Sequence, residues 1–369
     1  MFSSTRSLSL AIVAVCACVA FGASRLVADD GSANVVAETP VDSIQGNWLG
    51  VWTGREEGSG GKTVAQIYGL GNGEYQAVLV AYDSGEQDSG TFTFSIRGTT
   101  IAEGKVQFLQ NINLGPLGMF KFEALIEAGK LEGKYSNGAQ FEGGLKLSRL
   151  VKKIDAVGLP PAAGAVVLFD GKSLEKWTGA DTLAPAWEVR DGRIVAPVDA
   201  QPGPKSSGHL ASRDPLGDAQ IHLEFRLPYE PEARKELRAA GGVWIAGRYE
   251  IQLADSFGFP RSRDNLGEFD DVRALGAFFD VRAPKDQPGL PPGEWQALDI
   301  TFAAAKGTAP AELTVSLNGT TIHDHVKLDG PTPGAPVRDA DTAAGLVLER
   351  SGHAVEFRNI WYVPLANGK

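Results

Sequence analysis

The chain has 369 residues, with 35 basic and 45 acidic side chains and a formal net charge of −10. This acidic balance argues against nucleic acid as a partner, because phosphate recognition needs clustered lysine and arginine. A hydrophobic content of 43% is enough for large buried cores, and the length predicts about two domains. The 45 glycines and 21 prolines indicate many turns, as in all-β proteins.

Residues 1–28 have the pattern of a secretory signal peptide. Arg6 supplies the positive start, an apolar stretch follows over residues 8–21, and small residues up to Ala28 offer cleavage sites. The apolar stretch is short for a transmembrane helix, so an uncleaved membrane anchor is the less favoured alternative. The sequence therefore predicts an exported protein, periplasmic or extracellular, with no membrane span in the mature chain.

Both cysteines, Cys16 and Cys18, lie inside this leader. The mature chain would then have no disulfide, no thiol nucleophile and no thiolate-bound metal. Residues 29–44 lack hydrophobic periodicity and are expected to form a flexible segment. Neither region offers a catalytic group.

Residues 45–150 are predicted to form a small all-β accessory domain. Alternating runs such as 75–82 and 121–126 are separated by glycine-containing turn signals at short spacing, which favours an antiparallel sandwich or barrel. Trp48 and Trp52 are candidates for a sugar-stacking platform, but core or rim positions are the favoured interpretation. This domain shows no catalytic constellation.

Residues 151–165 contain Pro160 and Pro161 and are predicted to be a semi-rigid linker. Residues 166–365 then form a second strand-rich unit, with a short helical or loop segment at 230–239. Its predicted strands cover residues 220–227, 242–254, 296–302, 312–317, 345–348 and 355–363.

The most informative part of this unit is the run from Gly247 to Gly258. Three apolar side chains alternate there with three polar ones: Tyr249, Ile251 and Leu253 with Arg248, Glu250 and Gln252. In a strand, this period of two places the two sets on opposite faces. A cation, a carboxylate and an amide in one row are suited to binding a polyhydroxylated ligand.

Other predicted strands repeat this alternation. Ile221, Leu223 and Phe225 alternate with His222 and Glu224. Sheets with one apolar face and one polar face are typical of a curved two-sheet sandwich, whose concave face can hold an extended ligand. The sequence does not show which polar face is concave.

Several separated motifs of the second unit resemble the 3-keto-disaccharide hydrolase family. The resemblance covers residues 166–364, and the motifs together, in their order and spacing, are specific. They are Leu168-Phe169-Asp170-Gly171-Lys172-Ser173-Leu174 with Trp177, Trp187-Glu188-Val189 with Asp191-Gly192, Gly241 to Trp244, Gly247 to Gln252, Asp255 to Gly258, Gly276 to Phe279, Pro291 to Gln296, Leu317-Asn318-Gly319 and Phe357 to Trp361.

The resemblance implies a jelly-roll β-sandwich similar to concanavalin-like lectins and glucanases. It also implies activity on glycosides with a ketone at sugar carbon 3. Two positions depart from the family pattern. Residues 240–242 read Ala-Gly-Gly where the family has Asn-Ser-Gly, and residues 348–352 read Leu-Glu-Arg-Ser-Gly where it has Leu-Gln-Asp-His-Gly, with His353 displaced by two positions.

A ketone at carbon 3 acidifies the hydrogen on carbon 2, so a base, an oxyanion stabiliser and an acid for the leaving group are needed. Glu250 is the candidate base, because its mid-strand position between apolar neighbours would raise its pKa by burial. The other candidates are Arg248 or Arg358 for the oxyanion, Gln252 and Asp255 for sugar hydroxyls, Trp244 for stacking, and His353 as an acid or, if the site uses a divalent metal, as its ligand.

Each candidate also has a structural interpretation. Glu250 and Arg248 are equally well explained as a salt bridge, Asp255 as a turn cap and Arg358 as an anchor of the terminal strand. Trp177, Trp187, Trp295 and Trp361 are predicted to be core residues. A metal site at His323 and His325 is disfavoured because no third ligand is near, and the acids at 264–271 are better explained as a solvated loop.

The sequence thus predicts an exported carbohydrate-active protein that hydrolyses or eliminates the glycosidic bond of 3-keto-glycosides, with a carbohydrate as its ligand. A non-catalytic lectin-like module and a cell-surface structural protein are the alternatives. The metal requirement, the sugar and the oligomeric state are left open.

Overall fold

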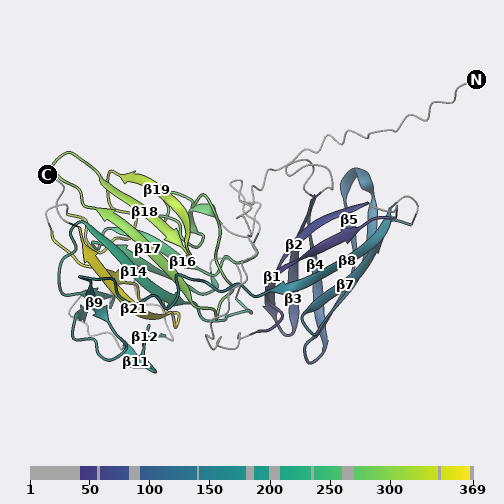
Figure 1. The fold of residues 1–369 in the computed structure, drawn as a ribbon, viewed down its shortest axis with the longest axis horizontal. Coiled ribbons are helices and arrows are strands. Elements are labelled where there is room, and N and C mark those ends of the chain that lie inside the picture. The colour runs from purple at the N-terminus through teal and green to yellow at the C-terminus, as the bar shows by residue number, and fades with distance from the viewer. Residues whose placement is uncertain are drawn as a thin grey trace, which may run out of the picture.

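The computed structural model describes residues 42–55, 59–82, 92–138, 141–179, 187–198, 208–233, 237–259, 270–339 and 342–365. Figure 1 shows two β-rich units joined by one connection. The predicted signal peptide and most of the segment at 29–44 lie outside the described residues. Within the described ranges, none of the helices has the length and apolar character needed to cross a membrane.

The N-terminal unit is a closed antiparallel barrel of eight strands, in which β1 pairs with both β2 and β8. A short 3-10 helix, Gly115–Leu117, connects β5 to β6. The strands are β1 (Gly46–Thr53), β2 (Gly60–Gly71), β3 (Glu74–Ala81), β4 (Phe92–Ala102), β5 (Lys105–Asn113), β6 (Met119–Glu127), β7 (Lys130–Ser136) and β8 (Glu142–Leu150).

The barrel interior is a packed core. Alternation along β2 places Ala65 and Ile67 inside, and large side chains such as Trp48 and Phe108 fill the centre with essentially no exposure. Trp52 is partly buried, and its indole Nε1 donates to the Tyr82 carbonyl at 2.8 Å. The core interpretation of these two tryptophans is therefore correct, and neither forms an exposed platform.

The C-terminal unit is a β-sandwich of two antiparallel sheets, and the predicted all-β class with a jelly-roll sandwich is confirmed. One sheet has five strands in the order β10 (Trp177–Gly179), β13 (Leu210–Ser212), β20 (Val347–Leu348), β15 (Ala240–Ile245) and β16 (Tyr249–Ala254). The other has eight: β11 (Glu188–Arg190), β12 (Arg193–Val195), β21 (Glu356–Pro364), β14 (Ala219–Arg226), β17 (Gln296–Ala303), β18 (Ala311–Leu317) and β19 (Thr320–Leu328), with β9 (Val166–Phe169) beside β21.

The sandwich core lies between the inner faces of the two sheets. Leu223 and Phe225 of β14 meet Ile251 and Leu253 of β16 in one cluster of fully buried side chains. Trp177 and Trp187 belong to the same cluster, as predicted. Burial of this many large apolar groups is the main favourable contribution to folding, and it fixes which faces of β14 and β16 point outward.

The predicted single strand over residues 242–254 is instead a hairpin. β15 ends at Ile245, β16 begins at Tyr249, and the turn between them contains Ala246 and Gly247 at φ of 51° and 62°. Two successive positive φ values reverse the chain tightly. This turn was missed because alanine, unlike asparagine or glycine, does not signal a left-handed conformation.

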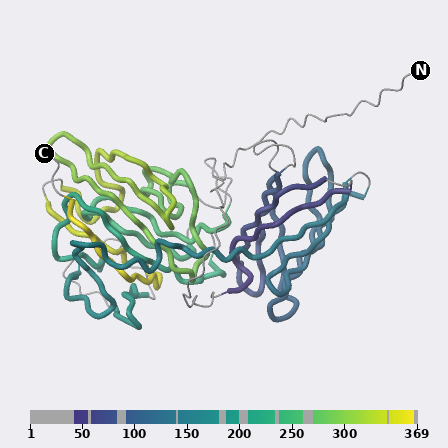
Figure 2. Tube along the Cα trace, viewed as in Figure 1, coloured from purple at the N-terminus to yellow at the C-terminus, as the bar shows by residue number. Residues whose placement is uncertain are grey.

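The path of the chain between the barrel and the sandwich can be followed in Figure 2. A polar cluster around the buried side chains of His222 and Glu224 fastens the linker to the sandwich. This linker clasp consists of His222, Glu224, Asp299, Arg358 and Asn359. Glu224 accepts hydrogen bonds from Arg358 Nε at 2.7 Å, from Asn359 Nδ2 at 2.8 Å and from the linker amide of Gly158 at 2.7 Å. Asn359 Nδ2 also donates to the Leu159 carbonyl at 2.7 Å. The clasp therefore explains how a proline-rich connection is held in one path.

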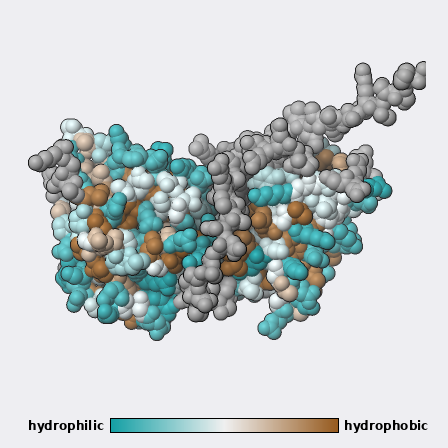
Figure 3. All heavy atoms as spheres, viewed as in Figure 1, coloured by the Kyte–Doolittle hydropathy of each residue, from teal (hydrophilic) through white to brown (hydrophobic). Residues whose placement is uncertain are grey.

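The outer faces of β2 and β3 of the barrel also contact the sandwich directly. Tyr68 packs against Phe259, with ring centroids 4.5 Å apart. Arg238, almost fully buried, donates from Nη1 to the Gly69 carbonyl at 3.2 Å. Asp42 accepts hydrogen bonds from Tyr75 of β3 and from Tyr229 of the sandwich. On the face seen in Figure 3, hydrophilic residues surround only small hydrophobic patches.

Candidate functional site

The outward face of the β15–β16 hairpin carries the polar residues singled out by the sequence. Tyr249, Ile251 and Leu253 lie in the core, so Glu250 and Gln252 point to the opposite side of the sheet, as predicted. That side is not open to solvent: Glu250 is 3% exposed and Gln252 is 8% exposed. Both side chains are therefore shielded from bulk water.

Two neighbouring strands bring further polar residues to this face. His209 directly precedes Leu210, and Glu349 directly follows Leu348, and these two leucines are paired partners whose side chains enter the core. Glu349 donates its backbone N–H to the Gly242 carbonyl at 2.9 Å. The His209 ring lies 4.8 Å from the Trp244 ring. Both His209 and Glu349 are buried.

Gly242, which has no side chain, lies at the centre of this group. Gly242 is the cross-strand partner of Gln252. A Cβ added at Gly242 would lie 2.5 Å from Glu250 Oε1, so the Glu250 carboxylate extends over the bare backbone. We call His209, Gly242, Glu250, Gln252 and Glu349 the site face. It combines two carboxylates, an imidazole and an amide, which are groups able to move protons and bind sugar hydroxyls.

Arg248 is not part of this face. It lies in the turn before β16, and its Nη1 donates to the Arg338 carbonyl at 2.8 Å. The Arg248 carbonyl accepts from the Thr332 N–H at 2.9 Å, and Thr332 Oγ1 accepts the Glu250 N–H at 3.0 Å. Arg248 therefore fixes a loop beside the hairpin, which differs from the predicted strand position beside Glu250.

Trp244 lies beside Glu250 but is not available for stacking on a sugar. The two residues are cross-strand partners. The Trp244 ring is 2% exposed and packs against Val347, Ala335 and His209. Trp244 therefore packs beside the site and orients the neighbouring side chains. It could stack on a sugar only if its packing against Val347, Ala335 and His209 opened.

Asp255 is bound to a cation instead of facing a ligand. Arg238 Nε donates to Asp255 Oδ2 at 2.7 Å, and the same guanidinium reaches Gly69 of the barrel. Both side chains are almost completely buried. Because Asp255 directly follows β16, the strand of the site face continues into the contact between the two units.

Arg358 lies on the other sheet. It belongs to β21, bonds Glu224 on the outer face of the eight-stranded sheet, and its guanidinium lies 3.9 Å from the Trp295 ring centroid. The whole sandwich core separates it from Glu250. The anchor interpretation fits this geometry, and an oxyanion role at the site face does not.

His353 lies beyond the end of β20 and pairs with a carboxylate. Its Nδ1 is 2.8 Å from Glu230 Oε2. Nearby, Ser351 Oγ donates to the Ala240 carbonyl at the start of β15 at 2.5 Å. These contacts tie the segment after Glu349 to the edge of the site face, with His353 partly exposed.

Sequence reasoning missed His209 and did not give Glu349 a role. His209 precedes a strand of three residues, which is too short to show a period of two. Glu349 did carry a signal, because it stands within the altered motif at 348–352. Its position beside Gly242 follows only from the pairing of β15 with β20.

The structure places His323 and His325, the pair at which the sequence disfavoured a metal site, in different environments. His323 is buried, with Nε2 2.8 Å from the Gly276 carbonyl, and burial lowers the pKa of His323 to about 4. His325 is exposed and bonds Glu312. Within the part of the chain that the structure describes, no three histidine, cysteine or acidic side chains are grouped so as to hold a metal ion.

The fold and the site face place the chain among glycosidase-like, carbohydrate-active β-sandwich proteins. A family model described as the 3-keto-alpha-glucoside-1,2-lyase-like domain matches residues 164–362, which is more than half of the chain. The chain therefore belongs to this family. The match includes the whole sandwich site face and excludes the barrel. No curated protein matches the sequence.

Solved structures similar to this chain include two candidate glycosyl hydrolases from Parabacteroides distasonis ATCC 8503. The first is 25% identical with a TM-score of 0.45, covering 55% of this chain and 84% of that one. The second is 18% identical with a TM-score of 0.39, covering 55% and 95%. A GH43 protein from Bacillus licheniformis is 10% identical with a TM-score of 0.30, covering 84% and 73%.

Proposed function

We propose that this protein cleaves the glycosidic bond of 3-keto-glycosides at the site face. The single observation that carries the proposal is the buried Glu250 carboxylate lying over Gly242, next to Gln252 and Glu349, within the part of the chain that matches the 3-keto-alpha-glucoside-1,2-lyase-like family. A buried carboxylate with amide and carboxyl neighbours is suited to remove a weakly acidic C–H proton.

The proposed reaction proceeds by elimination followed by hydration. Glu250 takes the proton from carbon 2, and the resulting enediolate expels the oxygen at carbon 1, which leaves with a proton. Water then adds across the new double bond, and the net result is hydrolysis. Elimination breaks the C1–O bond and hydration forms a new one, with no net change of oxidation state, so no redox partner is needed among the reactants.

The other residues of the site face have supporting roles in this proposal. Glu349 or His209 supplies the proton to the leaving oxygen, since a carboxyl group and an imidazole can both donate a proton and Glu349 lies beside Gly242. Gln252 binds a sugar hydroxyl through its amide, because it is the cross-strand partner of Gly242. His353 closes the edge of the site through its pair with Glu230.

The proposal includes export, because the leader at residues 1–28 has the pattern of a cleaved signal. N-terminal sequencing of protein recovered outside the cytoplasm should begin after this segment. Recovery of the intact N-terminus from the cytoplasm alone would contradict it.

The test is an assay on 3-keto-glucosides with the wild-type protein and Glu250→Gln. The neutral amide keeps the shape of the side chain but removes the base, so turnover is expected to fall at least about 100-fold. Unchanged turnover in the variant would remove Glu250 from its role. Binding of unoxidised glycans by calorimetry, with no product from any 3-keto-glycoside, would support a lectin-like module instead.

A further inference from the structure

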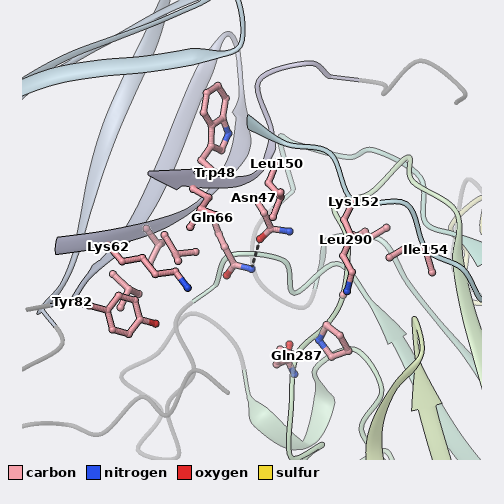
Figure 4. Close-up of a pocket in the computed structure, with 16 residues that line it drawn as sticks. Asn47, Trp48, Lys62, Gln66, Tyr82, Leu150, Lys152, Ile154, Gln287 and Leu290 are labelled. Carbon is pink, nitrogen blue, oxygen red and sulfur yellow. Dashed lines mark hydrogen bonds between the residues drawn. The ribbon is translucent and has the colours of Figure 1, made fainter. Parts of the chain in front are cut away.

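A pocket lies between the barrel and the sandwich, away from the site face (Figure 4). Its volume is about 160 Å³. One wall is the outer face of β1–β3, and the other consists of the linker near Lys152 and the sandwich loop over residues 287–290. Ligand pockets occur preferentially at such boundaries between domains.

The floor of this pocket is apolar. Leu49, Val64 and Val80 of the barrel face Leu290 of the sandwich loop across it. The adjacent part of the same barrel face, at Tyr68, is covered by phenylalanines of the sandwich. Within the part of the chain that the structure describes, the pocket thus adjoins an apolar surface that the two units bury against each other.

The polar groups around the pocket are hydrogen-bond donors and amides. Lys62 and Lys152 project from two sides of the open space, with Gln66 between them (Figure 4). Among the described residues neither lysine has an ion-pair partner, and the buried Nε2 of Gln287 has no hydrogen-bond acceptor. A buried donor without an acceptor costs about 1–3 kcal/mol, so a ligand that accepts its hydrogen bond is favoured.

The described residues that line the pocket carry positive charge, whereas the whole chain is negatively charged. The sequence has ten more acidic than basic residues, yet the described residues that line the pocket include two lysines and neither aspartate nor glutamate. Tyr82 lies beside Lys62, with its ring centroid 5.9 Å from the ammonium nitrogen. An apolar floor edged by cations and amide donors is complementary to a small ring compound that carries an anionic group.

We infer that this pocket binds an acidic sugar, in which a carboxylate or phosphate group is recognised by Lys62, Lys152 and Gln287. The anionic group follows from the pocket itself, while the choice of a sugar rests on the proposed function. Because both units line the pocket, the bound sugar stabilises the docked arrangement of barrel and sandwich in proportion to its occupancy. The barrel thereby gains a role that the family match does not include.

The test is calorimetric titration of the full chain with D-glucuronate, D-glucose 6-phosphate, D-glucose and inorganic phosphate. At least one acidic sugar should bind about tenfold more tightly than glucose and than phosphate. Lys62→Gln and Lys152→Gln should each weaken that binding about three- to fivefold, as expected for partly exposed ion pairs. The neighbouring exposed Lys153, which does not line the pocket, offers a matched control, and Lys153→Gln should leave the affinity unchanged.

Gln287→Leu separates a ligand role from a structural one. It removes the buried donor without an acceptor, so affinity should fall while thermal stability stays equal or rises. The inference is overturned if no acidic sugar binds, if glucose or phosphate alone binds as well, or if Lys153→Gln matches Lys152→Gln. Glu250→Gln should keep full affinity, and the lysine variants should keep wild-type turnover of a 3-keto-glucoside, so failure here is distinct from failure of the proposed function.

Discussion

Two buried polar clusters lie on opposite outer faces of the sandwich, and they differ in what surrounds them. In the linker clasp, Glu224 is enclosed by Arg358, Asn359 and the linker backbone. In the site face, the Glu250 carboxylate lies over Gly242, whose missing side chain leaves room for it. Both clusters come from strands with the same apolar–polar alternation. The alternation of apolar and polar residues along a strand therefore assigns a residue to a face of the sheet. The role of that residue depends on what covers the face.

The largest expected effect is on stability at the clasp. Glu224→Gln removes the buried anion that holds Arg358, His222 and the linker, so Arg358 loses its carboxylate partner and His222 keeps only Asp299. The free energy of unfolding should fall by about 3–5 kcal/mol, measured by urea denaturation. The protein that stays folded should keep its turnover per molecule. A loss of turnover in fully folded Glu224→Gln would make the clasp part of the reaction and would break the comparison.

The pH dependence of stability should also follow the clasp. Burial opposes charge on both groups, but hydrogen bonds to Asp299 and Glu224 raise the pKa of His222 to about 9, and bonds from His222, Asn359 and Arg358 lower the pKa of Glu224 to about 2. The contribution of His222 is present below its ordinary pKa of 6.5 and is lost as the pH rises toward 9. That of Glu224 is present above 4.5 and is lost as the pH falls toward 2.

The clasp should therefore stabilise the protein most between pH 4.5 and 6.5. The loss of stability below this range (the acidic limb) and the loss above it (the alkaline limb) should each be on the order of 3 kcal/mol. Urea midpoints measured from pH 3 to pH 9 test this. His222→Gln should flatten the alkaline limb. An alkaline limb of the same size in that variant would contradict the assignment.

At the site face, the added methyl group of Gly242→Ala should disturb chemistry more than stability. Its Cβ would meet Glu250 Oε1 at 2.5 Å and displace the carboxylate. Turnover of a 3-keto-glucoside should fall about tenfold to 100-fold, as for other small displacements of catalytic groups. Gly217→Ala is the matched control, because a Cβ there has no neighbour within 4 Å. Equal turnover of the two variants would show that the bare backbone at Gly242 is not needed.

The smallest effect is expected for Arg358→Lys. Lysine cannot reproduce the guanidinium contact with Glu224 or its packing on Trp295. These losses should cost about 1 kcal/mol of stability. The KM for a 3-keto-glucoside should not change, since Arg358 lies on the opposite sheet. A KM raised tenfold in this variant would instead support the substrate-binding role predicted from the sequence.

Much of the fold was predictable because it depends on local pattern. Alternation at Tyr249, Ile251 and Leu253 correctly identified the inner face of β16, and the spacing of turn signals identified the all-β accessory unit. The site was predictable only in part. Glu250 and Gln252 share one face, whereas Arg358, some hundred residues away in sequence, could not be assigned to a sheet without the strand order.

The remaining site residues depend on long-range pairing. His209 reaches the site face through β13 and β20, which have only three and two residues. Asp255 looked like a ligand-binding acid, but its partner Arg238 lies 17 positions earlier, in the segment predicted to be a short helix or loop. Buried ion pairs of this kind leave no periodic signal in the sequence, because each partner alone resembles an exposed charge.

The most direct test of the account is to measure Glu250→Gln and Glu224→Gln together, for turnover of a 3-keto-glucoside and for unfolding free energy. The account predicts that Glu250→Gln loses at least about 100-fold in turnover with a smaller loss of stability than Glu224→Gln. It predicts that Glu224→Gln loses about 3–5 kcal/mol of stability and keeps its turnover when folded. The reverse assignment of the two losses, or full turnover in Glu250→Gln, would contradict it.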